Sequence, residues 1–233
     1  MRIYPTKLFL DKQSFLYYNY SHNQLYRPNT HSQKEYKKLI KSYRSTNDYK
    51  QLLINTDHIK LIYSTLKEWN MDQRGAKLVS FSKFRKSILD NSDAIIKLHS
   101  VRIEAVQENQ LYTVLNDLKH LFISLEVMET KARIVGVSKT LHFLLPDLVM
   151  PIDRNNILDF LYLSKRYSSD PEKEFKVFQE IFIEYNRLSR QLSLSASDVD
   201  NKAWNTSIPK MIDNAVIGFL SALLAGSLLT ASN

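Results

Sequence analysis

Apolar residues recur at intervals of three and four along most of the chain, which is the spacing of amphipathic helices. Strand-like alternation is confined to short fragments such as 77–81. The sequence therefore predicts an all-α fold without internal repeats. The segments with helical spacing are 32–43, 59–69, 82–89, 92–103, 111–122, 138–145, 153–162, 171–188 and a last helix after 207.

Proline and capping residues mark several ends of these helices. Pro146 is expected to stop the helix that starts at Ser138. Pro171 directly after Asp170 is a strong start signal, since proline suits the first helical turn. Thr206 or Ser207 is expected to cap the last helix.

The first 31 residues differ from the rest of the chain. They are rich in tyrosine, asparagine and proline, and their apolar positions follow no clear period. We therefore predict an irregular N-terminal arm over residues 1–31 and a single globular helical domain over residues 32–233.

Basic charge is concentrated in the N-terminal half. Residues 1–100 hold 18 basic and 8 acidic side chains, whereas residues 101–233 hold 14 and 16. The same half holds nine of the thirteen tyrosines. Basic side chains interleaved with aromatic ones suit a surface that contacts phosphates and stacks bases. The alternative interpretation is a solvated basic surface with tyrosines in the core, because net charge does not specify a partner.

Composition excludes several classes of chemistry. The chain has no cysteine, which removes disulfides, thiolate metal sites and cysteine nucleophiles. Its four glycines are too far apart for a phosphate-binding loop, and its six histidines form no pair with metal-ligand spacing. We expect no cofactor and no metal.

The two ends of the chain bear on its location. The segment MRIYPTKLFLDKQ has no apolar stretch that suits a signal peptide, so we expect a cytoplasmic protein. No charge follows Asp213, and residues 215–231 are about long enough to span a membrane. We interpret this run as a buried terminal helix, and a tail anchor is the alternative. Membrane insertion is not expected.

The segment 133–161 is the most distinctive one. A glycine turn at Gly136 is expected to lead into a helix on which Lys139 and His142 share a face. Asp153 begins the following helix, with Arg154 beside it. Each residue also has a purely structural explanation: Asp153 as an N-cap, Lys139 as a solvated lysine and His142 as a hydrogen-bonded core histidine.

The run SKTLHFLLPDLVMPIDR at 138–154 resembles a block found in a bacterial protein family that has no established function. RGAKLVSFSKF at 74–84 and SIPKMIDNAVIGF at 207–219 resemble two further blocks of that family. Three positions depart from the family pattern. The family has Asn, His and Pro where this chain has Val137, Phe143 and Met150.

The order of parts also resembles the helix-hairpin-helix DNA glycosylases: glycine turn, lysine, apolar helix, proline, aspartate, new helix. This resemblance implies a lysine, here Lys139, that forms a Schiff base with the sugar, and an aspartate, Asp153, that stabilises charge at the anomeric carbon. The second glycine of the hairpin is missing here. The spacing of 14 residues from lysine to aspartate is about one helical turn shorter than in that family.

Two hypotheses follow, and the sequence leaves open whether the protein is an enzyme. The first is a DNA-binding protein with base-excision or lyase chemistry through Lys139 and Asp153, with His142 as a further catalytic candidate. It predicts that Lys139 and Asp153 meet in one cleft. The second is a non-catalytic helical interaction protein, with or without a tail anchor, in which Asp153 caps its helix and Lys139 is in solvent. The residues that we expect to contact nucleic acid are Arg74, Lys77, Gly136, Ser138 and Arg154.

Overall fold

The computed structural model describes residues 4–25, 30–72, 76–130, 133–161 and 170–230. Within these ranges there is no strand, only an isolated antiparallel bridge between Leu78 and Met128, so the all-α prediction is confirmed. The helices are α1 (Pro5–Leu8), α2 (Lys12–Leu25), α3 (His31–Ser45), α4 (Tyr49–Ile54), α5 (Thr56–Glu68), α6 (Phe81–Asp90), α7 (Ser92–Leu98), η1 (Ile103–Ala105), α8 (Glu108–Ser124), α9 (Ile134–Leu144), η2 (Arg154–Leu161), α10 (Pro171–Gln191), η3 (Ala196–Asp198) and α11 (Ile208–Thr230).

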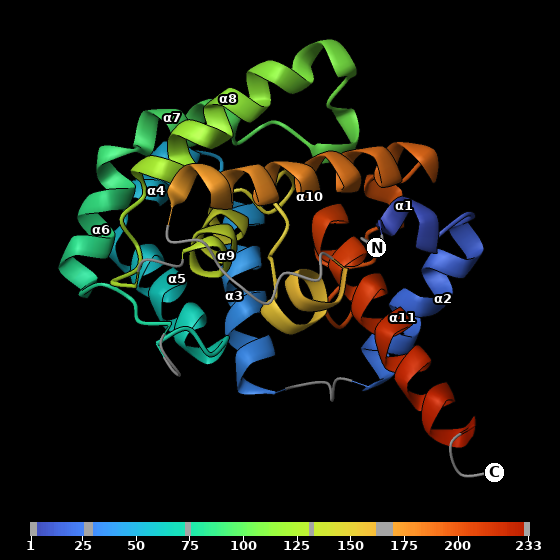
Figure 1. Cartoon of the computed structure of the whole chain (residues 1–233). Coiled ribbons are helices and arrows are strands. Elements are labelled where there is room, and N and C mark those ends of the chain that lie inside the picture. The colour runs from blue at the N-terminus through green and yellow to red at the C-terminus, as the bar shows by residue number, and fades with distance from the viewer. Residues whose placement is uncertain (1–3, 26–29, 73–75, 131–132, 162–169, 231–233) are drawn as a thin grey trace.

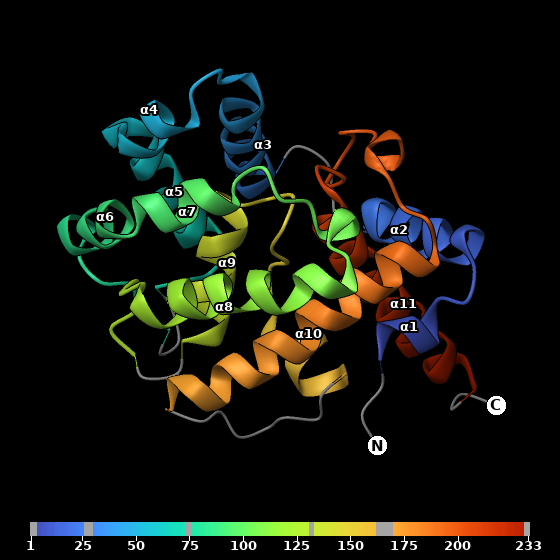
Figure 2. The same cartoon turned by 90° about the horizontal axis from the view of Figure 1, so that it is seen from above.

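Helix α9 lies at the centre of the molecule, between α5 on one side and α10 on the other (Figures 1 and 2). All of its residues except Val135 are buried. A helix that is buried on nearly all sides is enclosed by its neighbours, so the polar side chains of α9 are held in fixed positions.

The N-terminal region is helical, so the prediction of an irregular arm is wrong for residues 5–25. Helix α2 packs across α11 (Figure 1). Gly218 of α11 permits this approach, because a Cβ at that position would lie 2.0 Å from the carbonyl oxygen of Tyr18. The amide of Asn19 also donates to the carbonyl of Met211 at 2.9 Å. These tertiary contacts stabilise a helix whose own sequence has no clear apolar period.

Helix α11 is largely a core helix. The window Ile208–Ala225 is apolar and long enough to cross a membrane, and 67% of it is buried inside the protein. Core helices of soluble proteins pass the same length and apolarity test. Within the predicted run 215–231, residues 215–218 and Leu220 are buried, whereas Leu223 and Leu224 are 49% and 60% exposed. Burial therefore supports the buried-helix interpretation only for the first part of this run.

Gly136 does not form a turn, contrary to expectation. It lies in the first turn of α9, which begins four residues earlier than predicted, at Ile134. A Cβ on Gly136 would lie 2.2 Å from the sulfur of Met128. Its role is therefore close packing, and the glycine turn of a helix-hairpin-helix motif is not found at this position. The predicted stop holds, because α9 ends at Leu144, just before Pro146.

Candidate functional site

A cavity of about 240 Å³ opens where α9, the start of η2 and α11 meet the ends of α2, α3 and α5. Its lining includes both Lys139 and Asp153, which the first hypothesis expects in one cleft. Both polar and aromatic side chains line it, and the charged or aromatic ones are His22, Glu68, Trp69, Lys139, Asp153, Trp204, Lys210 and Asp213.

Lys139 is buried, with only 9% of its surface exposed. Its Nζ donates to the carbonyl of Trp69 at 3.2 Å and lies 5.8 Å from the centre of the Trp69 ring. Burial lowers the pKa of this amine, against the opposing effect of Asp153 and Asp213. A lysine held in this way is closer to the neutral amine that a nucleophile requires. The expectation of a solvated lysine is wrong.

Asp153 has two roles in the structure. Its Oδ1 accepts from the backbone N–H of Asn156 at 2.9 Å and from the Asn156 side chain at 3.0 Å, as an N-cap does. Its carbonyl accepts from both Ile157 and Leu158 at 3.2 Å, which begins the wide turns of η2. Wide helical turns of this kind are rare in proteins overall, and those that occur are often at functional sites. The capping prediction is therefore confirmed for Asp153, and the same residue lines the cavity that Lys139 lines.

Ser138 joins helix α9, which carries Lys139, to the segment that carries Asp153. It is fully buried, and its Oγ donates to the carbonyl of Val135 and accepts from the backbone N–H of Ile152 at 3.1 Å. Because Ser138 precedes Lys139 and Ile152 precedes Asp153, this hydrogen bond holds the two candidate residues beside each other. Ser138 is thus a positioning residue, and its burial argues against the predicted contact with nucleic acid.

Helix α11 adds a second lysine and a second aspartate to the cavity. Lys210 and Asp213 are 5% and 3% exposed. The Nζ of Lys210 donates to Oδ2 of Asp213 at 2.6 Å and to Oδ1 of Asn214 at 2.7 Å. Oδ1 of Asp213 has no hydrogen-bond partner among the described residues. Burial raises the pKa of Asp213, although Lys210 opposes the shift.

Two indole rings form the aromatic wall of the cavity. The Nζ of Lys210 lies 5.6 Å from the ring centres of both Trp69 and Trp204, within the range of cation–π attraction. Tyr36 packs against both rings, with ring centres 5.0 and 5.8 Å away. The two indole N–H groups are buried and have no partner in the part of the chain that the structure describes. The wall therefore offers two hydrogen-bond donors that the protein leaves unused.

His142 does not belong to this site. It is fully buried, and it is not among the residues that line the cavity. Its Nδ1 lies 2.7 Å from the carbonyl of Val149, and its Nε2 lies 2.8 Å from the hydroxyl of Tyr36. Since a carbonyl only accepts, Nδ1 donates and Nε2 accepts from Tyr36. Burial lowers the pKa of His142 to about 3, so the neutral ring is a structural connector, and the geometry does not support the predicted catalytic role of His142.

The remaining nucleic-acid candidates are scattered. Arg74 lies outside the described residues. Lys77 is exposed and pairs with Glu129 at 3.0 Å. Gly136 is enclosed in α9, as described above. Arg154 is exposed at the start of η2 but does not line the cavity.

Most of the N-terminal tyrosines pack inward. Tyr36 and Tyr49 are buried, whereas Tyr17 and Tyr20 are each 63% exposed. The core interpretation is therefore correct for most of the described tyrosines. The basic side chains do face solvent, and on α3 they form a stripe of exposed lysines at helical spacing. This α3 lysine stripe consists of Lys34, Lys38 and Lys41.

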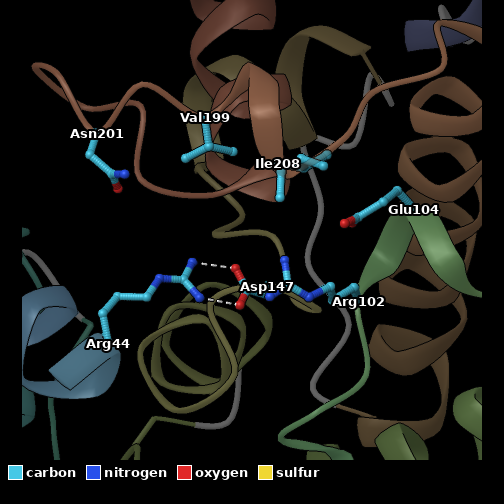
Figure 3. Close-up of a pocket in the computed structure, with 8 residues that line it drawn as sticks. Arg44, Arg102, Glu104, Asp147, Val199, Asn201 and Ile208 are labelled. Carbon is cyan, nitrogen blue, oxygen red and sulfur yellow. Dashed lines mark hydrogen bonds and ion pairs between the residues drawn. The ribbon is translucent and has the colours of Figure 1, made fainter. Parts of the chain in front are cut away.

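A second charged cavity, of about 220 Å³, lies at the other end of α3 (Figure 3). There the guanidinium of Arg44 meets Asp147 through two hydrogen bonds, and it also donates to the carbonyl of Thr206 at 3.2 Å. Val199 and Ile208 lie across from the pair. No group of three or more metal-ligating side chains occurs among the described residues.

Sequence reasoning singled out Lys139 and Asp153 but not Trp69, Lys210 or Asp213. The signal was available, because Lys210 and Asp213 belong to the run 207–219, one of the three blocks of the family resemblance. The structure brings that block and the block at 138–154 together at one cavity. Comparisons with protein-family models, curated proteins and solved structures find no match.

Proposed function

We propose that this protein binds DNA and acts on its sugar as a lyase or base-excision enzyme, with Lys139 as the nucleophile. The observation that carries the proposal is the burial of Lys139 in a cavity that it shares with Asp153. A buried amine beside a carboxylate is the arrangement in which a lysine attacks a sugar carbon and the developing positive charge is stabilised.

The chemistry begins with the neutral amine of Lys139. At an abasic site its lone pair forms a bond to C1′ of the sugar aldehyde, and the carbonyl electron pair moves to oxygen. Loss of that oxygen as water forms the C=N bond of a Schiff base. Removal of a C2′ proton then breaks the C3′–O bond and releases the 3′ phosphate. Water finally hydrolyses the Schiff base and returns the amine, so Lys139 is regenerated.

The basic charge of α3 and the order of helices along residues 134–161 support DNA as the substrate. The α3 lysine stripe, defined above, is exposed, and the first turn of α3 reaches the cavity through Ser32. An excess of basic side chains raises the local concentration of a polyanion. The sequence of helix, proline, Asp153 and second helix supports a helix-hairpin-helix glycosylase-like arrangement, with a close-packed Gly136 in place of the hairpin glycine.

The test is borohydride trapping on a duplex that contains one abasic site. We expect the wild-type protein to form a reduced covalent adduct and Lys139→Met to form none. Lys139→Met should fold with an unfolding free energy within about 1 kcal/mol of wild type, or higher, because a buried ammonium group is costly. Lys97→Met, which removes an exposed lysine paired with Asp117, is the matched control and should keep the adduct.

A second candidate function is a non-catalytic interaction protein. The observation that favours it is the pair of hydrogen bonds from Asn156 to Asp153, since capping alone accounts for an aspartate at that position. Absence of an adduct, together with binding to DNA that is weak and indifferent to the abasic site, would select this candidate.

A further inference from the structure

We propose that Asp213 is the proton-transfer residue of this cavity, a catalytic role that rests on the function proposed above. In this role Asp213 gives a proton to the departing hydroxyl as the Schiff base forms, and its carboxylate then takes the C2′ proton.

The position of Asp213 is what suggests the role. It lies one helical turn after Lys210 on α11, it is 3% exposed, and it lines the cavity together with Lys139. Its Oδ2 is held by Lys210 at 2.6 Å, whereas its Oδ1 has no partner among the described residues. A buried carboxylate oxygen without a donor is costly, so one that persists in a cavity is expected to serve a ligand.

The other carboxylates of the cavity are less suited to proton transfer. Asp153 is only partly buried, and its Oδ1 already accepts two hydrogen bonds from Asn156. The side chain of Glu68 is 38% exposed and lies 3.6 Å from His31, so it faces solvent. Asp213 is the carboxylate that combines burial with an unoccupied oxygen in the described part of the cavity.

The charges around Asp213 oppose one another. Lys210 on the same helix and Lys139 on α9 favour its ionised form, while burial and the charge of Asp153 favour its neutral form. Burial prevails, so the pKa of Asp213 is raised. The pKa of Lys139 is lowered in the same cavity. An acid whose pKa is shifted upward and an amine whose pKa is shifted downward are suited to exchange a proton with each other or with a substrate.

The remaining titratable neighbours do not compete for that proton. His22 on α2 lines the cavity, and burial lowers its pKa to about 3, so it stays neutral. Burial raises the pKa of the Tyr36 hydroxyl on α3, which therefore also stays neutral. Neither His22 nor Tyr36 therefore exchanges a proton with Asp213 or Lys139.

The proton that Asp213 gives up in the first step is restored to it in the second. After the amine adds to C1′, the neutral carboxyl of Asp213 donates its proton to the hydroxyl, which leaves as water while the nitrogen lone pair forms the C=N bond. The resulting carboxylate accepts the C2′ proton, whose C–H electrons form a C=C bond as the C3′–O bond breaks. The 3′ phosphate departs with that electron pair. Asp213 ends the step protonated again.

The experiment compares wild type, Asp213→Asn and Asp213→Glu on a duplex with one abasic site, and follows adduct formation and strand cleavage from pH 5 to 9. Asn keeps the size and the contact with Lys210 but cannot transfer the proton. We expect Asp213→Asn to slow cleavage by about 100-fold, while its affinity for the duplex changes less than about threefold. Asp213→Glu should retain part of the rate and shift the pH profile.

The outcomes separate the two proposals. If wild type forms an adduct and Asp213→Asn cleaves at the same rate with the same pH profile, the inference is overturned and the proposed function stands. If wild type forms no adduct, the proposed function fails, and the inference fails with it. Should Asp213→Asn not fold, Asp213→Glu decides: an unchanged rate and pH profile overturns the inference.

Discussion

The two charged cavities described above have similar sizes, about 240 and 220 Å³, but they differ in how far their basic side chains are exposed to water. In the Arg44 cavity, the Arg44 side chain is 36% exposed, and its guanidinium binds Asp147 through two nitrogens (Figure 3). In the Lys139 cavity, Lys139 and Lys210 are 9% and 5% exposed. The arginine of one cavity is thus partly open to water, whereas the two lysines of the other are buried.

This difference separates a structural ion pair from a candidate site. A partly exposed, doubly bonded arginine has its hydrogen-bonding needs met and connects α3 to the segment before α11 through Thr206. A buried lysine carries a desolvation cost, and in the Lys139 cavity Asp213 and two indoles have polar atoms without a hydrogen-bond partner among the described residues. Buried polar groups without partners point to a functional site, whereas groups whose hydrogen bonds are satisfied point to a structural role.

The largest expected effect comes from removing Lys210. Lys210→Met should lower the free energy of unfolding by about 3 kcal/mol, because it leaves the buried side chains of Asp213 and Asn214 without their shared donor. Arg44→Met is the matched change in the other cavity and should cost about 1 kcal/mol, since the Arg44 side chain is 36% exposed and water can partly replace it beside Asp147. Urea denaturation of both variants at neutral pH measures the difference. Equal losses in the two variants would remove the distinction between the cavities.

The next effect is a pH dependence of the folding stability, caused by His142 on α9. Its ring is hydrogen-bonded to Tyr36, which packs against the two indoles. The unfolded chain has an ordinary histidine pKa of about 6.5, whereas burial lowers the folded value to about 3. As pH falls below 6.5, only the unfolded state gains the proton, so stability is complete above 6.5 and is lost toward pH 3. The loss from this residue alone is about 2 kcal/mol at pH 5.

The variant that isolates this effect is His142→Gln, since its amide offers a donor to Val149 and an acceptor to Tyr36. We expect the stability difference between wild type and His142→Gln to narrow by about 2 kcal/mol between pH 7.5 and 5. Urea denaturation across this range measures it. Parallel stability curves would show that His142 is not held neutral.

The smallest effect tests how the Lys139 cavity is assembled. Ser138→Ala removes the acceptor of the Ile152 N–H and should cost about 1–2 kcal/mol, the penalty of an unsatisfied buried donor. Because that bond sets Asp153 beside Lys139, borohydride trapping should fall as well. Thr140→Ser keeps a hydroxyl that can bond the carbonyl of Gly136 and serves as the control in α9. Full trapping by Ser138→Ala would show that Lys139 and Asp153 align without this bond.

Much of the helical fold was predictable, because amphipathic periodicity reports on a buried face wherever it is strong. Helix α10 begins at Pro171, and α6 spans Phe81–Asp90, close to the predicted positions. The predicted helix 92–103 instead ends at Leu98, and Ile103 belongs to the separate short helix η1. Periodicity continued across that break because residues of a turn can still face the core.

The N-terminal helices could not be predicted in the same way. Helix α2 buries Phe15, Asn19 and His22, a face that includes two polar residues and therefore carries no apolar signal. Its partner is α11, about 190 residues later in the chain, as the bond from Asn19 to Met211 shows. The packing partner decides that these residues are helical, and local sequence does not report it.

The sequence by itself determined the all-α class, most helix ends, the basic N-terminal half, and Lys139 and Asp153 as candidates, because these depend on spacing and residue type. Only the tertiary structure decided that Lys139 is buried, that His142 is a connector, and that Lys210 and Asp213 join the same cavity. The physical reason is that burial and pairing arise between segments far apart in the chain, where periodicity carries no information.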